Sequence, residues 1–251
     1  VKEVLAGFTS FSVSRELATN LRPSADYERV SLLLKQSTEA QRFLSLKPDF
    51  SMGRVKDVRE MAKMAALGKV LEPVSLVEIQ ETLASTRQLR NALSKLSKEL
   101  PLLCEIAGGI VELRRLEEDI GSCLTAEGEV LDTASPQLSL LRQQSKQVRE
   151  QLLSRLQGII RSPRGRRIFQ EPIIAEREGR YVVPVKVEFR REIKGIVHDV
   201  SNTGATVFVE PMSTVEMGNE LRELVLEEKR EVERILRGLS SEVGAHEAEI
   251  S

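Results

Sequence analysis

The order of apolar and polar residues divides this chain into helical stretches and one strand-rich stretch. Over residues 1–132, apolar side chains recur every three or four positions, which is typical of amphipathic helices. Ser24 is in position to cap one of these helices, and Ser75 with Glu78 forms a capping box that predicts the start of another. The apolar positions expected on the first of them are Val30, Leu33, Leu34, Phe43 and Leu44.

Two longer helices are predicted further along the chain. The first begins at Ser135-Pro136, where a capping serine precedes a proline at the first helical position, and continues to about Arg161. The second begins at a capping box of Ser213 and Glu216 and runs to about Glu249. Their apolar seams are Leu138, Leu141, Val148, Leu152, Leu156 and Ile159 in the first helix and Leu221, Val225, Val232, Ile235, Leu239 and Val243 in the second. We expect the two helices to form an antiparallel pair.

The hydrophobic period changes to two between these helices, from Ile168 onwards. A hairpin is predicted to turn at Glu178-Gly179, and further strands are predicted over 195–200 and 205–209. Pro184 favours an edge strand or a bulge at its position. The residues that alternate onto the apolar face of the second strand are Tyr181, Val183, Val185, Val187 and Phe189. Four short strands form a sheet that needs support from helices.

These patterns predict a mainly α-helical protein with a small inserted β-sheet. The expected domains are a helical core over 1–134, the two long helices over 135–167 and 213–251, and a β insert over 168–212. The composition agrees, because 41% hydrophobic residues can bury a core and few aromatics favour aliphatic helix seams.

The charge is distributed unevenly although the net charge is only −1. Residues 142–194 carry 14 lysines and arginines against 6 acidic residues, a net +8 that leaves −9 for the rest of the chain. Such asymmetry indicates an acidic or nucleic-acid partner for one end of the molecule.

The basic residues gather at the end of the first long helix and on the strands that follow. One interpretation is a solvated face with favourable charge at a helix C-terminus. Contact with phosphates is the favoured interpretation, because little acidic charge lies nearby in the sequence. Tyr181 and Phe189 are expected in the core rather than as base-stacking platforms. The candidate nucleic-acid-binding residues are Arg161, Arg164, Arg166, Arg167, Arg177, Arg180, Lys186, Arg190, Arg191 and Lys194.

The sequence carries no recognisable catalytic constellation. It contains neither a G-x-x-x-x-G-K-[ST] phosphate loop nor a G-x-G-x-x-G motif. His198 and His246 lack metal-ligand neighbours, so His198 is expected to be a structural or surface residue. The carboxylates over 216–233 alternate with basic residues and predict a solvated, salt-bridged helix face. Cys104 and Cys123 are expected to be small buried residues of a cytosolic protein. We therefore expect no catalysis, cofactor or metal in this chain.

The chain also lacks the apolar run of ~20 residues that a membrane span requires, and no signal peptide is visible. A cytoplasmic protein without membrane contact is expected. The chain begins at Val1 rather than Met and ends at Ser251 within a helical pattern, which indicates a piece of a longer protein.

One continuous segment is also familiar as a family pattern. GRYVVPVKVEFRREIKGIVHDVSNTGATVFVEPMSTVEMGNELREL closely resembles the clamp segment of the bacterial MutS-two family, the MutS-like proteins linked to suppressing recombination. Its motif elements are G-R-Y-V-x-P-V, G-I-V-H-D, G-A-T, E-P and N-E-L. FTSFSVSRELATNLRPS, near the start, resembles the first helical segment of that family.

The resemblance implies a helical core with lever helices and a β clamp at the lever tip, here 135–167 and 213–251 for the levers and 168–212 for the clamp. In the family these parts precede an ABC-type ATPase, where ATP and Mg²⁺ are expected, and often a nuclease domain. The resemblance also implies a homodimer of the full-length protein that acts on DNA, including branched and recombination intermediates. Nothing in this chain resembles the mismatch-reading, ATPase or nuclease domains.

Two alternatives remain open from the sequence. The family has also been associated with stalled or collided ribosomes, so the basic cluster could bind ribosomal RNA. A second alternative is a non-catalytic helical scaffold that binds other proteins.

Overall fold

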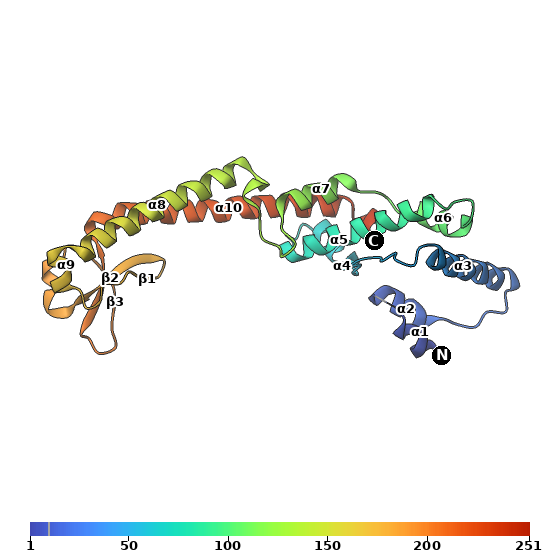
Figure 1. Ribbon diagram of the computed structural model, residues 1–251, viewed down its shortest axis with the longest axis horizontal. Coiled ribbons are helices and arrows are strands. Elements are labelled where there is room, and N and C mark those ends of the chain that lie inside the picture. Colours follow the sequence, from blue (N-terminus) through green and yellow to red (C-terminus); the bar gives the residue numbers. More distant parts are fainter. Residues whose placement is uncertain (10) are drawn as a thin grey trace. The chain divides into compact units, whose positions relative to one another are not determined.

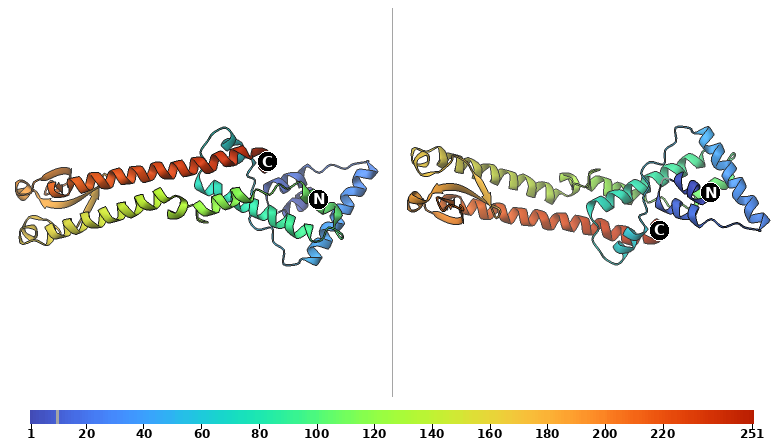
Figure 2. Two further views of the ribbon diagram at one scale, coloured as in Figure 1. Left: turned by 90° about the horizontal axis from the view of Figure 1, so that it is seen from above. Right: turned by 90° about the horizontal axis from the view of Figure 1, so that it is seen from below.

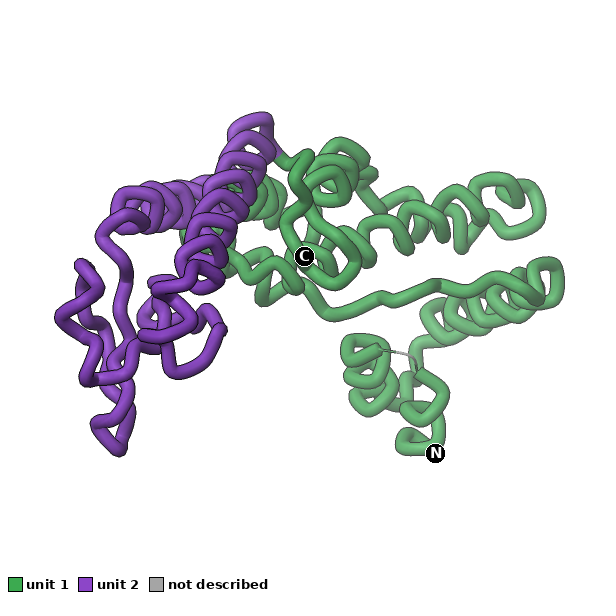
Figure 3. The backbone as a smooth tube through the Cα atoms, turned by 60° about the vertical axis from the view of Figure 1, so that its left-hand side comes forward, with its two compact units in different colours: residues 1–134, 234–251 green, residues 135–233 purple. Residues whose placement is uncertain are grey.

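The computed structural model describes residues 1–9 and 11–251, so Ser10 of the FTSFSVS segment lies outside the described residues. The protein is mainly α-helical with a small four-stranded antiparallel sheet, as predicted (Figure 1). The chain divides into two compact units, one of residues 1–134 with 234–251 and one of residues 135–233 (Figure 3). Each unit is described by itself below.

In the first unit α6 and α7 pack on α5, α3 packs on α6, α1 packs on α2, and α4 packs on α11. Leu76 and Ile79 of α5 are completely buried. A second cluster joins Phe43, Leu93 and Leu100. The helices are α1 (Lys2–Gly7), α2 (Ser12–Asn20), α3 (Tyr27–Leu46), α4 (Arg59–Ala66), α5 (Pro73–Ser94), α6 (Pro101–Gly108), α7 (Arg114–Cys123) and α11 (Glu247–Ile250).

Two predicted helix starts in this unit are wrong. Asp26 rather than Ser24 caps α3, since its carboxylate accepts a hydrogen bond from the Arg29 backbone N–H at 3.1 Å. Helix α5 begins at Pro73, so Ser75 lies inside the helix instead of capping it. The first residue of a helix needs no N–H donor, and proline has the φ angle that the helix requires. Pro73 therefore starts the helix two residues earlier than the serine would.

The apolar positions of α3 are mostly solvent-exposed. Phe43 is buried and Val30 is half-buried, but Leu34 and Leu44 are 63% and 60% exposed. Cys104 and Cys123 are half-buried free thiols rather than fully buried ones. Burial nevertheless raises the pKa of the Cys104 thiol, which donates to the Leu93 carbonyl at 3.0 Å.

The second unit consists of a pair of long helices and the sheet. Its helices are α8 (Pro136–Arg161), α9 (Pro163–Ile168), the first part of α10 (Val215–Ala245), and short 3-10 helices over Val187–Glu192 and Met212–Thr214. Its strands are β1 (Ala175–Arg177), β2 (Arg180–Lys186), β3 (Gly195–Val200) and β4 (Thr206–Pro211). The strand order in space is β1-β2-β4-β3.

The turn residues of the sheet follow the prediction. Glu178 and Gly179 have φ values of 51° and 74°, and Gly204 has a φ of 70°. A pair of left-handed residues suits a two-residue hairpin between twisted strands. β2 is interior in the strand order, but β1 pairs with it only over residues 180–182, so at Pro184 the strand has a strand partner on one side only, as expected. The Pro184 carbonyl accepts a hydrogen bond from the Gln170 N–H at 2.9 Å. The backbone of Pro184 therefore faces away from β4, and the N–H that proline lacks is not needed for pairing with that strand.

Strand β2 is shorter than predicted and is buried on both faces. Val182 and Val183 are both inaccessible to solvent, so the expected alternation of buried and exposed residues does not hold. The predicted strand positions Val187 and Phe189 lie instead in the 3-10 helix. Phe189 packs at the edge of the core, where the sequence placed it.

Helices α8 and α10 run side by side and antiparallel within this unit (Figure 2). The Ser135 hydroxyl caps α8 by accepting from the Leu138 N–H at 3.0 Å and donates to the Glu231 carboxylate at 2.6 Å. Further along, the Arg142 Nε donates to Glu228 at 2.8 Å. Glu231 is only 3% exposed, so the prediction of a fully solvated acidic face is wrong at this residue.

The seam of α8 also supports the sheet. Leu152, Leu156 and Ile160 pack against the valines of β2 and β4 that lie on one face of the sheet. This helical cover supplies the support that a small sheet requires. Ile160 takes the place predicted for Ile159, and Val225 of α10 is 43% exposed. The buried residues of α8 are Leu138, Leu141, Ser145, Val148, Leu152, Leu156 and Ile160.

Ser145 is a polar residue at a seam position, and we expect its removal to stabilise the protein. The side chain is 6% exposed, and its hydroxyl has no hydrogen-bond partner within the described part of the chain. A buried unsatisfied hydroxyl costs about 1–3 kcal/mol, and alanine is the best helix former. Ser145→Ala should therefore raise the free energy of unfolding by about 1 kcal/mol in urea denaturation. The exposed Ser154→Ala is the control, and equal effects of the two changes would contradict this account.

Candidate nucleic-acid interface

Helix α9 brings several basic residues together where the sequence predicted only the end of a helix. Ser162 follows α8 directly, and its hydroxyl accepts from the Gly165 N–H at 2.9 Å and donates to the Ile159 carbonyl at 2.7 Å. It therefore ends one helix and caps the next. Gly165 permits the tight junction, since a Cβ there would lie 2.2 Å from the Ile159 carbonyl oxygen. The following turn displays Arg164, Arg166 and Arg167.

Arg164 and Arg167 both contact Glu192. The Arg164 guanidinium donates to the Glu192 backbone carbonyl and lies 3.9 Å from the Glu192 carboxylate. Arg167 forms an ion pair with the same carboxylate, and its guanidinium lies 5.5 Å from the centre of the Phe189 ring. The Lys186 ammonium donates to the Arg167 carbonyl at 3.4 Å. Helix α9 is thus tied to the 3-10 helix and to the end of β2.

Four candidate side chains are exposed and bind nothing in the structure. They have neither a hydrogen bond nor an ion pair to any other described residue. One is the last residue of α8, one lies in α9, one lies in the 3-10 helix over Val187–Glu192, and one lies just before β3. They are Arg161, Arg166, Arg191 and Lys194.

Two other candidates are used inside the unit. Arg190 donates to the carbonyls of Ile193 and Gly195, both at 3.0 Å, and so holds the chain that leads into β3. Arg180 is directed into the interior, as described below. Arg177 is partly exposed but has partners within the unit. It forms an ion pair with Asp199 at 2.9 Å, and its guanidinium lies 4.3 Å from the centre of the Phe208 ring.

An ionic network around the buried Glu210 carboxylate joins three strands to the exposed Asn219 of α10. The Glu210 carboxylate is 2% exposed and accepts from Arg180 Nη1 at 3.3 Å, while its other oxygen lies 2.7 Å from His198 Nε2. Arg180 Nη2 donates to the Asn219 side chain at 2.7 Å. Gly218 allows this approach, because a Cβ there would lie 2.6 Å from a Glu210 carboxylate oxygen. His198 is therefore a structural residue, as the sequence indicated.

The register of β3 explains how His198 reaches Glu210. The pairing with β4 shifts between Val197 and Asp199, which leaves His198 in a bulge. A bulge re-aims a side chain relative to a regular strand. Asp199 is consequently free to pair with Arg177 on β1, at the exposed side of the sheet.

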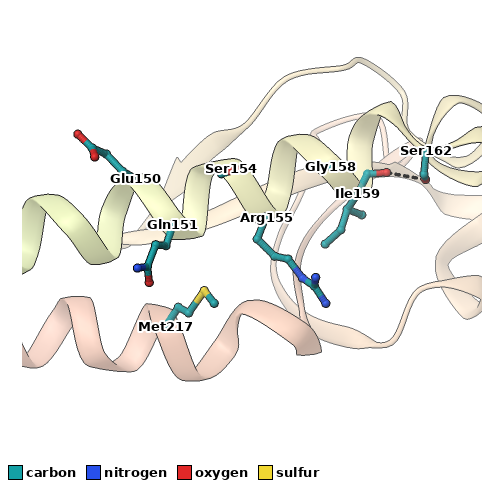
Figure 4. A pocket seen from close by; sticks show the side chains of 8 residues that line it. All are labelled: Glu150, Gln151, Ser154, Arg155, Gly158, Ile159, Ser162 and Met217. Carbon is teal, nitrogen blue, oxygen red and sulfur yellow. Dashed lines mark hydrogen bonds between the residues drawn. The ribbon is translucent and has the colours of Figure 1, made fainter.

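An open groove of about 860 Å³ lies between α8 and the first turn of α10 (Figure 4). Figure 4 shows Gln151 and Arg155 of α8 beside Met217 of α10. The remaining lining residues are Glu150, Ser154, Gly158, Ile159 and Ser162. The groove is lined by one carboxylate, one guanidinium and two serine hydroxyls. These groups are not arranged as a nucleophile next to a general base would be.

Neither a metal site nor a membrane span is found in the part of the chain that the structure describes. Within residues 1–9 and 11–251, no three His, Cys, Asp or Glu side chains gather as a metal site would require. Over the same residues, each helix is too short or too polar to cross a bilayer.

Comparison with known proteins finds relatives of one kind. No protein-family model matches the chain. It is 39% identical over 246 residues to the endonuclease MutS2 of Pelotomaculum thermopropionicum, and the match covers 98% of this chain and 31% of that protein. It is 41% identical over 250 residues to the endonuclease MutS2 of Geobacillus thermodenitrificans, covering 98% and 32%. The putative endonuclease MutS2 of Bacillus subtilis is 34% identical over 253 residues, covering 100% and 32%.

Nearly the whole chain is therefore similar to MutS2 proteins. It spans about a third of the length of the MutS2 relatives that it matches. The resemblance found in the sequence is therefore confirmed.

The structure also gives a physical reason for part of the MutS-two motif. Arg180 stands in G-R-Y, His198 in G-I-V-H-D, Glu210 in E-P and Asn219 in N-E-L, and hydrogen bonds join all four in the network around Glu210. Nothing in the sequence predicted this network, although each of its members lies in one of the motif elements. Those elements hold the β-sheet to α10.

Proposed function

We propose that this chain is the nucleic-acid-clamping and lever part of a MutS-two protein that acts on DNA, including branched recombination intermediates. Residues 168–212 are the clamp, 135–167 and 213–251 are the lever helices, and 1–134 are the helical core. ATP and Mg²⁺ act in the parts of the longer protein that this chain does not include. The protein is a cytoplasmic homodimer.

The observation that carries the proposal is the set of exposed, unpaired cations around α9 and the 3-10 helix of the β region. Arg161, Arg166, Arg191 and Lys194 have no acidic partner among the described residues, so their charge is available to a ligand. A polynucleotide backbone releases counterions when such side chains neutralise its phosphates. The endonuclease names of the relatives support DNA as the polymer.

The lever role is supported by the connections of the sheet to both long helices. Leu156 of α8 packs in the core beneath the sheet, while Asn219 of α10 joins the network around Glu210. A shift of α10 along its axis would therefore move the strands through a hydrogen-bonded contact. Binding and motion are thereby coupled without any chemistry in this chain.

Removing three unpaired cations should weaken nucleic-acid binding. In the full-length dimer, Arg161→Ala, Arg166→Ala and Arg191→Ala together should reduce the slope of log K against log salt on duplex DNA. The expected reduction is ~0.9 for each phosphate that the variant no longer neutralises. The decrease in affinity should be similar across sequences, because bonds to phosphates carry no base information. The dimer is used because two clamps acting together gain avidity.

The matched control changes three exposed cations of α10, with Arg222, Lys229 and Arg230 each replaced by alanine. It alters the net charge equally and should leave the slope near that of the wild type. Equal slopes for wild type and the α9-region variant would contradict the proposal. Competition between branched DNA and ribosomes tests ribosomal RNA as the partner, and preference for ribosomes would replace DNA in the proposal.

We also expect the chain to be catalytically silent. It should neither hydrolyse ATP nor cut DNA, because it contains no phosphate loop. The measurements are phosphate release and nicking of plasmid DNA, each with Mg²⁺ present. Turnover that persists through purification, and disappears when a residue of this chain is changed, would overturn the expectation.

A further inference from the structure

A cavity of about 450 Å³ lies where α9, the 3-10 helix and the Met212–Thr214 turn meet. Its charged lining consists of two cations, Arg164 and Lys194, and one acid, Glu192. Ser162 and Ser213 also line it, and the hydroxyl of Ser162 is already used to cap α9. Basic and hydroxyl groups of this kind bind phosphate oxygens in proteins.

Glu192 is the acidic residue in this otherwise basic lining. Its carboxylate pairs with Arg167 and lies 3.9 Å from Arg164 Nε. A carboxylate and a phosphate accept hydrogen bonds from guanidinium groups in the same manner. The Glu192 carboxylate therefore occupies the position in which a phosphate would be held by the two arginines.

The arginines are held by other contacts that do not depend on this carboxylate. Arg164 also donates to the Glu192 backbone carbonyl, and Arg167 lies over the Phe189 ring. The backbone of Arg167 is fixed by the hydrogen bond from Lys186. If the carboxylate moved away, both guanidinium groups would remain in place for another anion. The Glu192 side chain is 35% exposed and can swing into solvent.

We propose that this cavity is a phosphate-binding site and that Glu192 is its internal competitor. A backbone phosphate displaces the carboxylate and takes over Arg164, which lines the cavity with Lys194, and Arg167, which reaches Glu192 from outside the lining. This inference rests on the proposed clamp function and assigns it a specific site. Because each phosphate must first displace the carboxylate, Glu192 weakens binding of isolated phosphates and favours a polymer that also binds the unpaired cations.

The test compares Glu192→Gln with Glu188→Gln in the full-length dimer. Glu188 lies in the same 3-10 helix, is exposed and has no described partner, so both changes add the same charge. Glu192→Gln should bind duplex DNA about 2–5-fold more tightly than Glu188→Gln at low salt, as expected for removal of an exposed ion pair. Its salt slope should be steeper by up to ~0.9.

A second measurement does not depend on nucleic acid. In the 251-residue chain, inorganic phosphate is titrated while the Nε–H NMR signals of Arg164 and Arg167 are followed. Glu192→Gln should saturate at a lower phosphate concentration than Glu188→Gln. Equal behaviour of the two variants in the phosphate titration would overturn the inference whatever the DNA result.

The outcomes separate the inference from the proposed function. If Glu192→Gln binds phosphate more tightly but the wild-type dimer shows no salt-dependent DNA binding, the phosphate site is supported and the clamp function is wrong. If DNA binding depends on Arg161, Arg166 and Arg191 but Glu192→Gln matches Glu188→Gln in both measurements, the clamp stands and the site is wrong.

Discussion

Replacing Glu210 by glutamine is expected to lower the free energy of unfolding of the 135–233 unit by about 3–5 kcal/mol. The carboxylate is 2% exposed, and the Arg180 side chain that it pairs with is 15% exposed. Glutamine keeps the size but leaves a buried guanidinium without its counter-charge. The decrease in stability thus measures an uncompensated charge rather than a change in packing.

The measurement is urea denaturation followed by tyrosine fluorescence. The chain has no Trp and two Tyr residues, one in each unit. In a Tyr27→Phe background, which alters a residue that is 84% exposed, Tyr181 alone reports on the unit with the sheet. Glu220→Gln on the exposed side of α10 is the control and should change stability by less than about 0.5 kcal/mol.

A second variant checks the cause of this destabilisation. If the unpaired guanidinium is responsible, combining Arg180→Met with Glu210→Gln should recover part of the stability, because removing both charges is far less costly than removing one. A Glu210→Gln variant as stable as the Glu220→Gln control would show that the network does not support the fold.

Replacing Gly165 by alanine is the second change expected to have a large effect. A Cβ at this position would lie 2.2 Å from the Ile159 carbonyl oxygen and 2.5 Å from the Ile160 carbonyl oxygen. Both are backbone atoms of α8, so α9 itself must move. Overpacking of this kind costs typically about 1–3 kcal/mol, and the displacement should also weaken DNA binding by disturbing Arg164 and Arg167.

Gly158→Ala is the matched control for this change. Gly158 lies in α8 with open space around it, so alanine there should stabilise the helix by about 0.5–1 kcal/mol. Opposite signs for the two glycine-to-alanine changes are the expected result in urea denaturation. A neutral Gly165→Ala with unchanged DNA affinity would mean that the α8–α9 junction is not tightly constrained.

The features that the sequence predicted well depend on short-range rules. The serine cap at Ser135, the proline after it and the left-handed pair at Glu178-Gly179 each act over a few residues. The period of the apolar residues likewise follows from local geometry. These rules are enough to recognise the two long helices, the hairpin and the inserted sheet.

Short-range rules were also the source of the errors in helix starts. Ser24 and Ser75 both have the right side chain for a cap, yet α3 begins directly after Asp26, and α5 begins at Pro73, two residues before Ser75. Ser162 acts at the ends of two helices: its hydroxyl donates to the last turn of α8 and accepts from the first turn of α9. Sequence alone predicted the interruption there but not the second helix.

The sequence by itself determined the mainly helical class, the place of the β insert, the excess of positive charge and the family resemblance. Tertiary structure alone decided which charges are available to a ligand. Arg180 and Arg190 carry the same group as Arg166 and Arg191, but the first two are used to hold strands while the latter two remain exposed. Glu210 lies 30 positions from Arg180 along the chain, a separation that the hydrogen bond in the folded structure spans. Charge pairing depends on distances of a few ångströms, and only folding brings such distant residues that close.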